Sequence, residues 1–451
     1  MKKERVLLTL GTADIGKLLI EYAIPAIIAM LAVSLYNITD SIFIGHGIGV
    51  MALSGLAITF PIMNLAAAVG SLIGIGAATL MSLRLAQKDY VAANYILGNV
   101  YVLNLITGIL FSVTALIFLN PILIFFGASS QVLPYARDFM IIILAGNVVT
   151  HTYIGLNTLL RSAGHPQKAM YATIITIFMN LILNPLFIFK FGWGIRGSAA
   201  ATIISQFLVL AWQVWFFSNS KSFIYLKKEF FRLRKEIVKG IFSIGIAPFL
   251  LNAAGCVVIV LMNKNLSYYG GNLAVGAYGI VNRIAYLSVM IVFGLNQGMQ
   301  PIVGYNYGAA LYERVTEVLK KTIIIAVATM TFGSVLIELF PYLVASIFTD
   351  EKNLIDMTTT GLRYAFMFSP LIGFQMVVST FFQSIGKAQK TIFLSLTRQV
   401  IFLIPLLIIL PKYMNISGVW ISMPISDLAS SIVTICLFTT QYRKLQSKKT
   451  G

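Results

Sequence analysis

The stretch Ile24–Gly45, IPAIIAMLAVSLYNITDSIFIG, decides how this chain folds and points to what it does. Its length and apolar character are those of a helix that crosses a membrane, which needs about 20 residues. Asp40 stands near its end. Taking a carboxylate into hydrocarbon costs at least about 2.5–3.5 kcal/mol, so such residues are usually kept to carry a proton or an ion. The alternative is a helix-end carboxylate that reaches water, and polar neighbours at the same depth argue against it.

The composition of the whole chain is that of a polytopic membrane protein. Of its 451 residues, 58% are hydrophobic and 11% are charged, and the mean hydropathy is +0.87, whereas soluble domains carry about 25% charged residues. The net charge of +18 is carried by basic residues between the apolar runs, which indicates topology anchors and no nucleic-acid partner. Cys256 and Cys436 lie inside apolar runs and predict neither a disulfide framework nor a metal site.

The apolar runs predict an all-α polytopic membrane protein with twelve transmembrane helices. The expected spans are 18–45, 53–81, 95–119, 137–158, 169–189, 198–218, 241–264, 273–303, 321–345, 358–381, 391–411 and 417–439. Basic residues gather in every second loop and in both tails. Because basic loops stay in the cytoplasm, we expect both termini to be cytoplasmic and the protein to lie in a prokaryotic cytoplasmic membrane.

The second half of the chain repeats the first. Residues Leu160–Lys168 (LRSAGHPQK) return as Phe382–Lys390 (FQSIGKAQK), and Pro25 returns as Pro248, with an offset that stays at 221 to 223 residues. Six spans in each copy give both copies one topology, so they are parallel repeats about an axis along the membrane normal. Such lobes enclose a cavity near mid-membrane and rock around it. The repeat therefore favours a transporter that works by alternating access.

The repeat also divides the chain into domains. We expect a first lobe at 1–220 with spans 1–6, a second lobe at 241–440 with spans 7–12, and a basic cytoplasmic tail at 441–451. Residues 221–240 alternate apolar residues with lysine and arginine. This pattern predicts an amphipathic helix that lies on the inner membrane surface and connects the lobes. A polybasic regulatory site is the alternative for this segment.

Several motifs resemble those of the multidrug and toxic compound extrusion (MATE) family. They are Leu35–Asp40 (LYNITD), Arg161–Gly164 (RSAG), Asn184–Pro185 and Gln300–Ala309 (QPIVGYNYGA). The resemblance covers essentially the whole chain and is nearest to the DinF-like or archaeal type of branch. It implies two six-helix lobes, a cation-coupled antiporter that exports amphipathic, often cationic compounds, and a coupling carboxylate in the first lobe.

The residues around Asp40 predict the coupling site independently. On the first span, positions i and i+4 share a face with Asp40, and the fifth and sixth spans place polar residues about 8 Å from their outer ends, at the same depth. The expected coupling residues are Tyr36, Asp40, Asn180, Asn184 and Thr202. Pro185 has no N–H to donate to the carbonyl of Leu181, which leaves that oxygen available to water or a cation. We expect structural kinks at Pro25 and Pro185.

The coupling ion is expected to be H⁺. Many relatives of the resembled family carry an aspartate where this chain has Asn184, so here Asp40 alone supplies formal charge. A Na⁺ site with oxygen ligands from Asp40, Asn180, Asn184 and Thr202 stays chemically open, but one carboxylate holds it weakly. No other cofactor is expected. We hypothesise that protonation of Asp40 expels the substrate and that the ionised form holds it.

In the second lobe the expected polar features are fewer. Asp427 and Arg398 lie in adjacent spans and are interpreted as a structural ion pair, since buried charges are usually paired; a second coupling or substrate-binding carboxylate is the alternative. Arg283 has no partner evident from the sequence. Three polar residues are expected to line the substrate cavity: Asn37, Gln297 and Gln300.

The expected partners are amphipathic cationic small molecules and the lipid bilayer, and we expect a monomer. The sequence contains no His-Glu-x-x-His, no Gly-x-Ser-x-Gly and no phosphate-binding glycine loop, so an enzyme is not expected. The remaining alternative is a flippase for lipid-linked oligosaccharides from the same exporter superfamily. Such a protein would need a broad cationic cavity for pyrophosphate, and the few arginines within spans favour cationic cargo instead.

Overall fold

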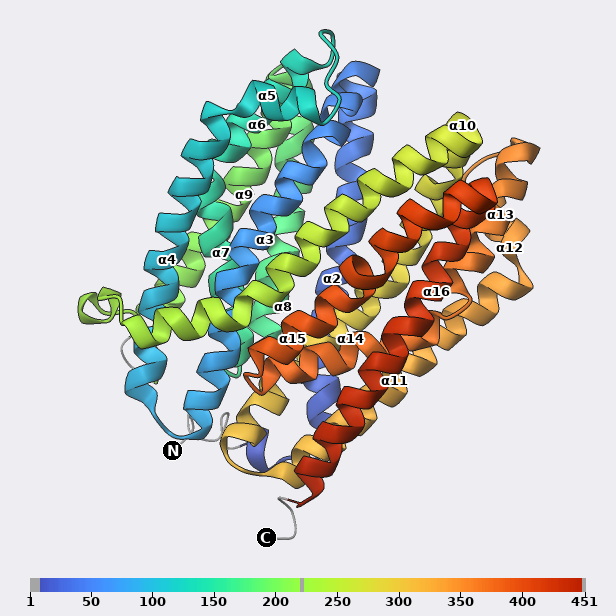
Figure 1. Cartoon of the computed structure of the whole chain (residues 1–451). Coiled ribbons are helices and arrows are strands. Elements are labelled where there is room, and N and C mark those ends of the chain that lie inside the picture. Colours follow the sequence, from blue (N-terminus) through green and yellow to red (C-terminus); the bar gives the residue numbers. More distant parts are fainter. Residues whose placement is uncertain (1–8, 220–222, 448–451) are drawn as a thin grey trace. The chain divides into compact units, whose positions relative to one another are not determined.

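The computed structural model describes residues 9–219 and 223–447, and every regular element within these ranges is a helix (Figure 1). In a bilayer each backbone N–H and C=O must find its partner inside the protein, and a helix provides these partners locally. The elements of the first half are α2 (Ile15–Gly47), α3 (Val50–Ala86), α4 (Tyr90–Ile117), α5 (Leu119–Phe125), α6 (Leu133–Ala145), α7 (Asn147–Ser162), α8 (Pro166–Pro185), the π-helix η1 (Leu186–Lys190) and α9 (Gly194–Phe217). The all-α prediction is confirmed.

The second half follows the same plan after a short 3-10 helix. Its elements are η2 (Lys228–Phe231), α10 (Lys235–Gly308), α11 (Tyr312–Leu339), α12 (Pro341–Ser346), α13 (Lys352–Phe366), α14 (Ser369–Ser384), α15 (Ala388–Leu396), the π-helix η3 (Thr397–Leu403) and α16 (Ile404–Ser447). Two of these helices contain a break. Gly271 interrupts α10 with φ 65° and ψ −166°, and Asn415 interrupts α16 with φ 51° and ψ −134°.

The described residues contain nine helical segments that are long and apolar enough to cross a membrane. Two bent pairs, α6 with α7 at 55° and α13 with α14 at 47°, raise this number to eleven. The segment Ala388–Ser447 is 60 residues long and covers two of the predicted spans, 391–411 and 417–439. A multi-span helical protein is therefore confirmed, whereas the count of twelve spans is not.

The chain divides into two compact units whose limits differ from the predicted lobes at 1–220 and 241–440. The first unit holds Ile28–Phe249 and the described residues before Ala13; the second holds Ala13–Ile27 and the chain from Leu250 onward. Helices α2 and α10 therefore contribute to both units. The repeat-related prolines, Pro25 and Pro248, lie just before the points where the chain changes unit.

Close backbone packing explains why the start of α10 belongs to the first unit. A Cβ atom at Gly76 of α3 would lie 2.1 Å from the carbonyl oxygen of Ile241, and one at Gly245 would lie 1.8 Å from that of Leu72. These distances leave no room for a side chain at either glycine. The two backbones touch directly, so residues 241–249 pack on α3 as part of that unit.

The second unit holds the start of α2 in the same way. A Cβ atom at Gly294 of α10 would lie 2.5 Å from the Cα of Ile27, and one at Gly298 would lie 2.6 Å from the Cα of Ala23. With the repeat offset of about 222 residues, Gly294 and Gly298 correspond to Leu72 and Gly76 of α3. Each repeat thus uses its second long helix to hold the start of the first helix of the other repeat.

The predicted amphipathic connector helix at 221–240 is wrong for the described residues. Residues 223–234 contain a single short 3-10 helix, η2, and α10 begins at Lys235; residues 221 and 222 lie outside the described ranges. The predicted tail at 441–451 is helical as part of α16 as far as Ser447, and its last residues also lie outside these ranges.

Hydrogen bonds to α4 replace the helical hydrogen bonds of the connector. The Asn99 amide donates to the carbonyls of Phe230 at 3.3 Å and Arg232 at 3.0 Å, and its oxygen accepts from the backbone N–H of Arg234 at 2.9 Å. Side-chain amides that bind the backbone in this way compete with regular helix formation. Aromatic and basic side chains of the segment also pack on α4: the Phe230 ring contacts that of Tyr95, and the Arg234 guanidinium lies 3.3 Å from the centre of the Tyr95 ring.

Candidate functional site

Asp40 lies in α2, within the first unit, and only 8% of the residue is exposed. Its Oδ1 accepts hydrogen bonds from the amide Nδ2 of Asn184 on α8 and, at 3.0 Å, from the hydroxyl of Ser198 on α9. Both donors are neutral groups. Three helices therefore meet at one acidic group, and the hydrogen bonds that the described residues give to it come from neutral side chains.

A second set of polar contacts centres on Thr202 of α9. Its Oγ1 lies 3.1 Å from the hydroxyl of Tyr36 and accepts a hydrogen bond from Asn180 Nδ2 at 3.1 Å. The same hydroxyl donates to the backbone carbonyl of Ser198 at 3.2 Å, as a group with one donor and two acceptor sites can. The Ser198 residue links both sets, and the structure brings all five predicted coupling residues together.

Two oxygen atoms of this site have no hydrogen-bond donor among the described residues. They are the Oδ1 atoms of Asn180 and Asn184, and both are buried. A buried amide oxygen without a partner costs about 1–3 kcal/mol, so each is a place for a water molecule, a proton donor or a cation. Together with Asp40 they are oxygen ligands of the kind that hard cations take.

The Asn184 amide can serve Asp40 in more than one way. Its Nδ2 faces the carboxylate in this structure, and an N–H donor can bond the oxygen of an ionised carboxylate or the carbonyl oxygen of a protonated one. When the amide turns, its oxygen can accept from a protonated Asp40 or coordinate Na⁺. The residues therefore fit either ion.

Ser198 was not among the residues predicted from the sequence. It stands one helical turn before Thr202, on the same face of α9, and is fully buried. A small hydroxyl at position i−4 from a predicted site residue is the signal that would have found it. The predicted sixth span starts at residue 198, so the sequence alone favours a role for Ser198 at the start of the helix.

The two prolines predicted to cause kinks behave differently. At Pro185 the α-helix α8 ends, and the next five residues form the π-helix η1. Short π-helical stretches are frequent at functional sites, because they shift the side chains that follow. Helix α2 runs through Pro25 without interruption from Ile15 to Gly47. The structure thus shows a change of helix type at one proline and a continuous helix at the other.

The residues predicted to line the substrate cavity lie apart from the Asp40 cluster or in the other unit. Asn37 is exposed on α2, so it does not share the buried environment of Asp40. Gln297 and Gln300 lie in the second unit, on α10, where Gln300 is buried. Their role as substrate-contacting residues remains a prediction.

The expected ion pair of the second half is present. Arg398 Nε lies 2.5 Å from Asp427 Oδ1, and the aspartate side chain is 1% exposed. Arg283 is exposed on α10. In the described part of the chain, no three histidine, cysteine, aspartate or glutamate side chains gather closely enough to hold a metal ion.

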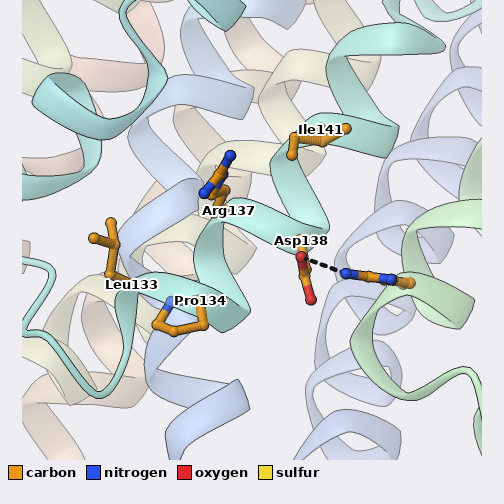
Figure 2. A pocket seen from close by; sticks show the side chains of 6 residues that line it. Leu133, Pro134, Arg137, Asp138 and Ile141 are labelled. Atoms are coloured by element: carbon orange, nitrogen blue, oxygen red, sulfur yellow. Dashed lines mark hydrogen bonds and ion pairs between the residues drawn. The ribbon is translucent and has the colours of Figure 1, made fainter.

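A cavity of about 400 Å³ lies elsewhere in the first unit, and Figure 2 shows it between α6 and α9. It is lined by Leu133, Pro134, Arg137, Asp138, Ile141 and Arg196. Its two helices are joined by an ion pair of 2.9 Å between Arg196 and Asp138, drawn as a dashed line in Figure 2. None of the predicted coupling residues lines this cavity, and its ion pair is half exposed.

Comparison with known proteins gives one consistent result. A family model described as MatE matches residues 25–186 and 246–409, one match in each repeat. The multidrug export protein MepA of Staphylococcus haemolyticus is 24% identical over 440 residues, which are 98% of this chain and 95% of that protein. MepA of Staphylococcus aureus strain MRSA252 is 23% identical over 425 residues, 94% of each chain.

Solved structures agree with this result. The MATE multidrug transporter DinF-BH superimposes with a TM-score of 0.89 and is 34% identical, covering 95% of this chain and 96% of that one. A multidrug resistance MATE transporter of the MOP superfamily in an outward-facing conformation superimposes with a TM-score of 0.90 at 24% identity, covering 100% of this chain and 99% of that one.

Proposed function

Because this chain belongs to the MATE (MatE) family, we propose that it is a multidrug exporter that moves amphipathic, mainly cationic compounds out of the cell in exchange for protons. The multidrug exporters among its relatives match it over nearly their whole length, which supports the substrate class. We place it in the cytoplasmic membrane with both termini in the cytoplasm, on the basis of the positive-inside pattern. We also expect it to act as a monomer.

The buried Asp40 is the observation that carries the proposal. It is held by neutral donors from two other helices. An ionised carboxylate in such a place is stabilised by hydrogen bonds but retains its full negative charge, so it attracts a proton or a cationic substrate. Both cannot neutralise it at once, and this competition makes the exchange obligatory.

A transport cycle follows from these contacts. Ionised Asp40, with the Asn184 amide donating to it, holds the cationic substrate from the inner side. When a proton arrives from the outer side, Asp40 becomes a donor, and the Asn184 amide turns so that its oxygen accepts. The substrate then loses its counter-charge and leaves. Release of the proton to the inner side restores the starting arrangement.

We favour H⁺ over Na⁺ as the coupling ion because the site contains a single carboxylate. Asn184 occupies the place where a second acidic group would strengthen a Na⁺ site. An Asn184→Asp variant would supply that second charge, so we expect it to bind Na⁺ measurably more tightly than the parent protein. Isothermal titration calorimetry with NaCl in a Na⁺-free buffer measures this difference directly.

The experiment that tests the proposal is efflux of a fluorescent cationic dye from proteoliposomes, driven in turn by an H⁺ gradient and by a Na⁺ gradient. We expect efflux with the H⁺ gradient and its loss in Asp40→Asn. The matched control is Asp356→Asn, which removes an exposed carboxylate of α13 and should leave efflux unchanged.

Three results would change the conclusion. Gradient-driven efflux that persists in Asp40→Asn would show that this carboxylate does not couple transport. Efflux with the Na⁺ gradient alone would make the same residues a Na⁺ site. No dye efflux with either gradient, together with translocation of a lipid-linked oligosaccharide, would favour the flippase alternative.

A further inference from the structure

We infer that Arg398 and Asp427 form a second cation site, which the protein keeps occupied with its own guanidinium group. This inference goes beyond the coupling proposed for Asp40, and its test does not depend on that coupling. It concerns the second unit alone, in which η3, α14 and α16 meet around the two residues.

The pair has the geometry of a carboxylate with a bound cation. Arg398 Nε lies 2.5 Å from Asp427 Oδ1. The aspartate side chain is 1% exposed, whereas that of the arginine is 29% exposed. The carboxylate is therefore the fixed, enclosed part of the site, and the guanidinium reaches into it on a flexible chain from a less enclosed position.

Neutral side chains fix the backbone that carries the carboxylate. Gln375 of α14 donates to the backbone carbonyl of Asp427 at 2.9 Å and to the hydroxyls of Ser430 at 2.9 Å and Ser431 at 2.5 Å. Ser431 donates in turn to the Asp427 carbonyl at 2.6 Å. These bonds hold the backbone of α16 rather than the carboxylate oxygens, so a cation is still needed to balance the charge.

The charged and titratable groups that face Asp427 in the described part of the chain are few. Arg398 of η3 is its direct partner. Tyr278 of α10 lies close enough to Arg398 to feel its charge. Helices α14 and α16 present Gln375, Ser430 and Ser431, which are neutral. Arg398 is therefore the group that decides whether Asp427 has a counter-ion.

The internal repeat places this pair beside the counterpart of the proposed coupling site. With the offset of about 222 residues, Arg398 corresponds to Thr176 and Asp427 to Ser205. In the first unit these two hydroxyls donate to carbonyls of their own helices. They stand about one turn from Asn180 and Thr202, so both repeats place polar chemistry between the fifth and sixth spans.

The two repeats differ in where the charge stands. The first has its carboxylate on the first span, at Asp40, and the corresponding residue of the second is Asn263. The second repeat has its carboxylate on its sixth span, at Asp427, and the guanidinium of Arg398 lies beside it. A π-helical segment, η1 or η3, lies in the fifth span of each repeat. The first repeat thus keeps the carboxylate of Asp40 available to an incoming ion. In the second repeat, the guanidinium of Arg398 permanently occupies the place beside Asp427.

Removal of the guanidinium should expose a second proton-binding carboxylate. The experiment is a potentiometric titration of the purified full-length protein between pH 8 and pH 5.5, which counts the protons bound per chain. We expect Asp427→Asn to bind as many protons as the parent, because the Arg398 guanidinium already balances the charge of the Asp427 carboxylate. We expect Arg398→Gln to bind one proton more than the double variant Arg398→Gln/Asp427→Asn. Arg398→Lys keeps the positive charge and should match the parent.

Equal proton counts for Arg398→Gln and the double variant would overturn the inference, as would a lower count for Asp427→Asn than for the parent. If Arg398→Gln does not fold, Arg398→Ala offers a second measurement with methylguanidinium as the probe. The probe should raise the melting temperature of Arg398→Ala and leave that of Arg398→Ala/Asp427→Asn unchanged. No rise in Arg398→Ala would also contradict the inference.

Discussion

At the scale of single residues, we expect the neutral donors around Asp40 to set the pH of the proton exchange proposed for it. Ser198 donates to the carboxylate at 3.0 Å, and a hydrogen bond to a charged group is worth about 1.5–3 kcal/mol. Ser198→Ala removes a bond that favours the ionised form, so protonation should occur at higher pH. We expect the pH midpoint of proton-driven efflux to rise by about one unit, since one unit corresponds to about 1.4 kcal/mol.

Ser205→Ala provides the matched control for this prediction. Its hydroxyl lies on the same helix, α9, is buried to the same degree, and donates to the carbonyl of Ala201 in its own helix at 2.7 Å. We expect its efflux midpoint to equal that of the parent. An unchanged midpoint in Ser198→Ala, or equal shifts in the two variants, would show that the Ser198 hydroxyl does not act on Asp40.

At the scale of elements, Asn99 fixes the connector to α4 through its three hydrogen bonds to the backbone of residues 230–234. Asn99→Ala leaves two carbonyls and one N–H without these partners, at a cost of about 1 kcal/mol or more for each group that stays buried. We expect a lower melting temperature and faster cleavage of the connector by trypsin. Asn120→Ala, at an exposed position of α5, should change neither; unchanged cleavage in Asn99→Ala would contradict the role assigned to this residue.

At the scale of the whole molecule, the starts of α2 and α10 each pack in the unit formed by the other repeat, and this packing depends on glycines that allow backbone contact. A Cβ atom at Gly298 would meet the Cα of Ala23 at 2.6 Å, whereas one at Gly279 of the same helix meets nothing within 4 Å. We expect Gly298→Ala to lower the melting temperature by several degrees. Gly279→Ala should raise it slightly, because alanine stabilises a helix interior by about 0.5–1 kcal/mol over glycine. Shifts of the same sign in both variants would mean that this packing does not hold α2 in place.

The sequence by itself determined the helical architecture, the internal repeat, the family and the residues around Asp40. Within a membrane every backbone group must bond inside its own helix, so the helices follow from local apolar runs. The group of Asp40, Asn184 and Thr202 also followed from the sequence, since helical periodicity and depth within a span place polar residues in register. Ser198 was missed because it stands where the apolar segment begins, so the sequence favours a helix-start role over a contact with Asp40.

The tertiary structure decided the features that depend on contacts between distant segments. The connector has an amphipathic pattern, yet within residues 223–234 it forms the short 3-10 helix η2, and the Asn99 amide of α4 binds the backbone of residues 230–234. Glycines such as Gly76 and Gly298 let two backbones touch, and so they hold the start of the first helix of each repeat in the unit formed by the other repeat. Neither effect has a local sequence pattern. The Asn99 amide bonds a backbone that is remote in the sequence, and the glycines make room for one, so both contacts form only when the chain has folded.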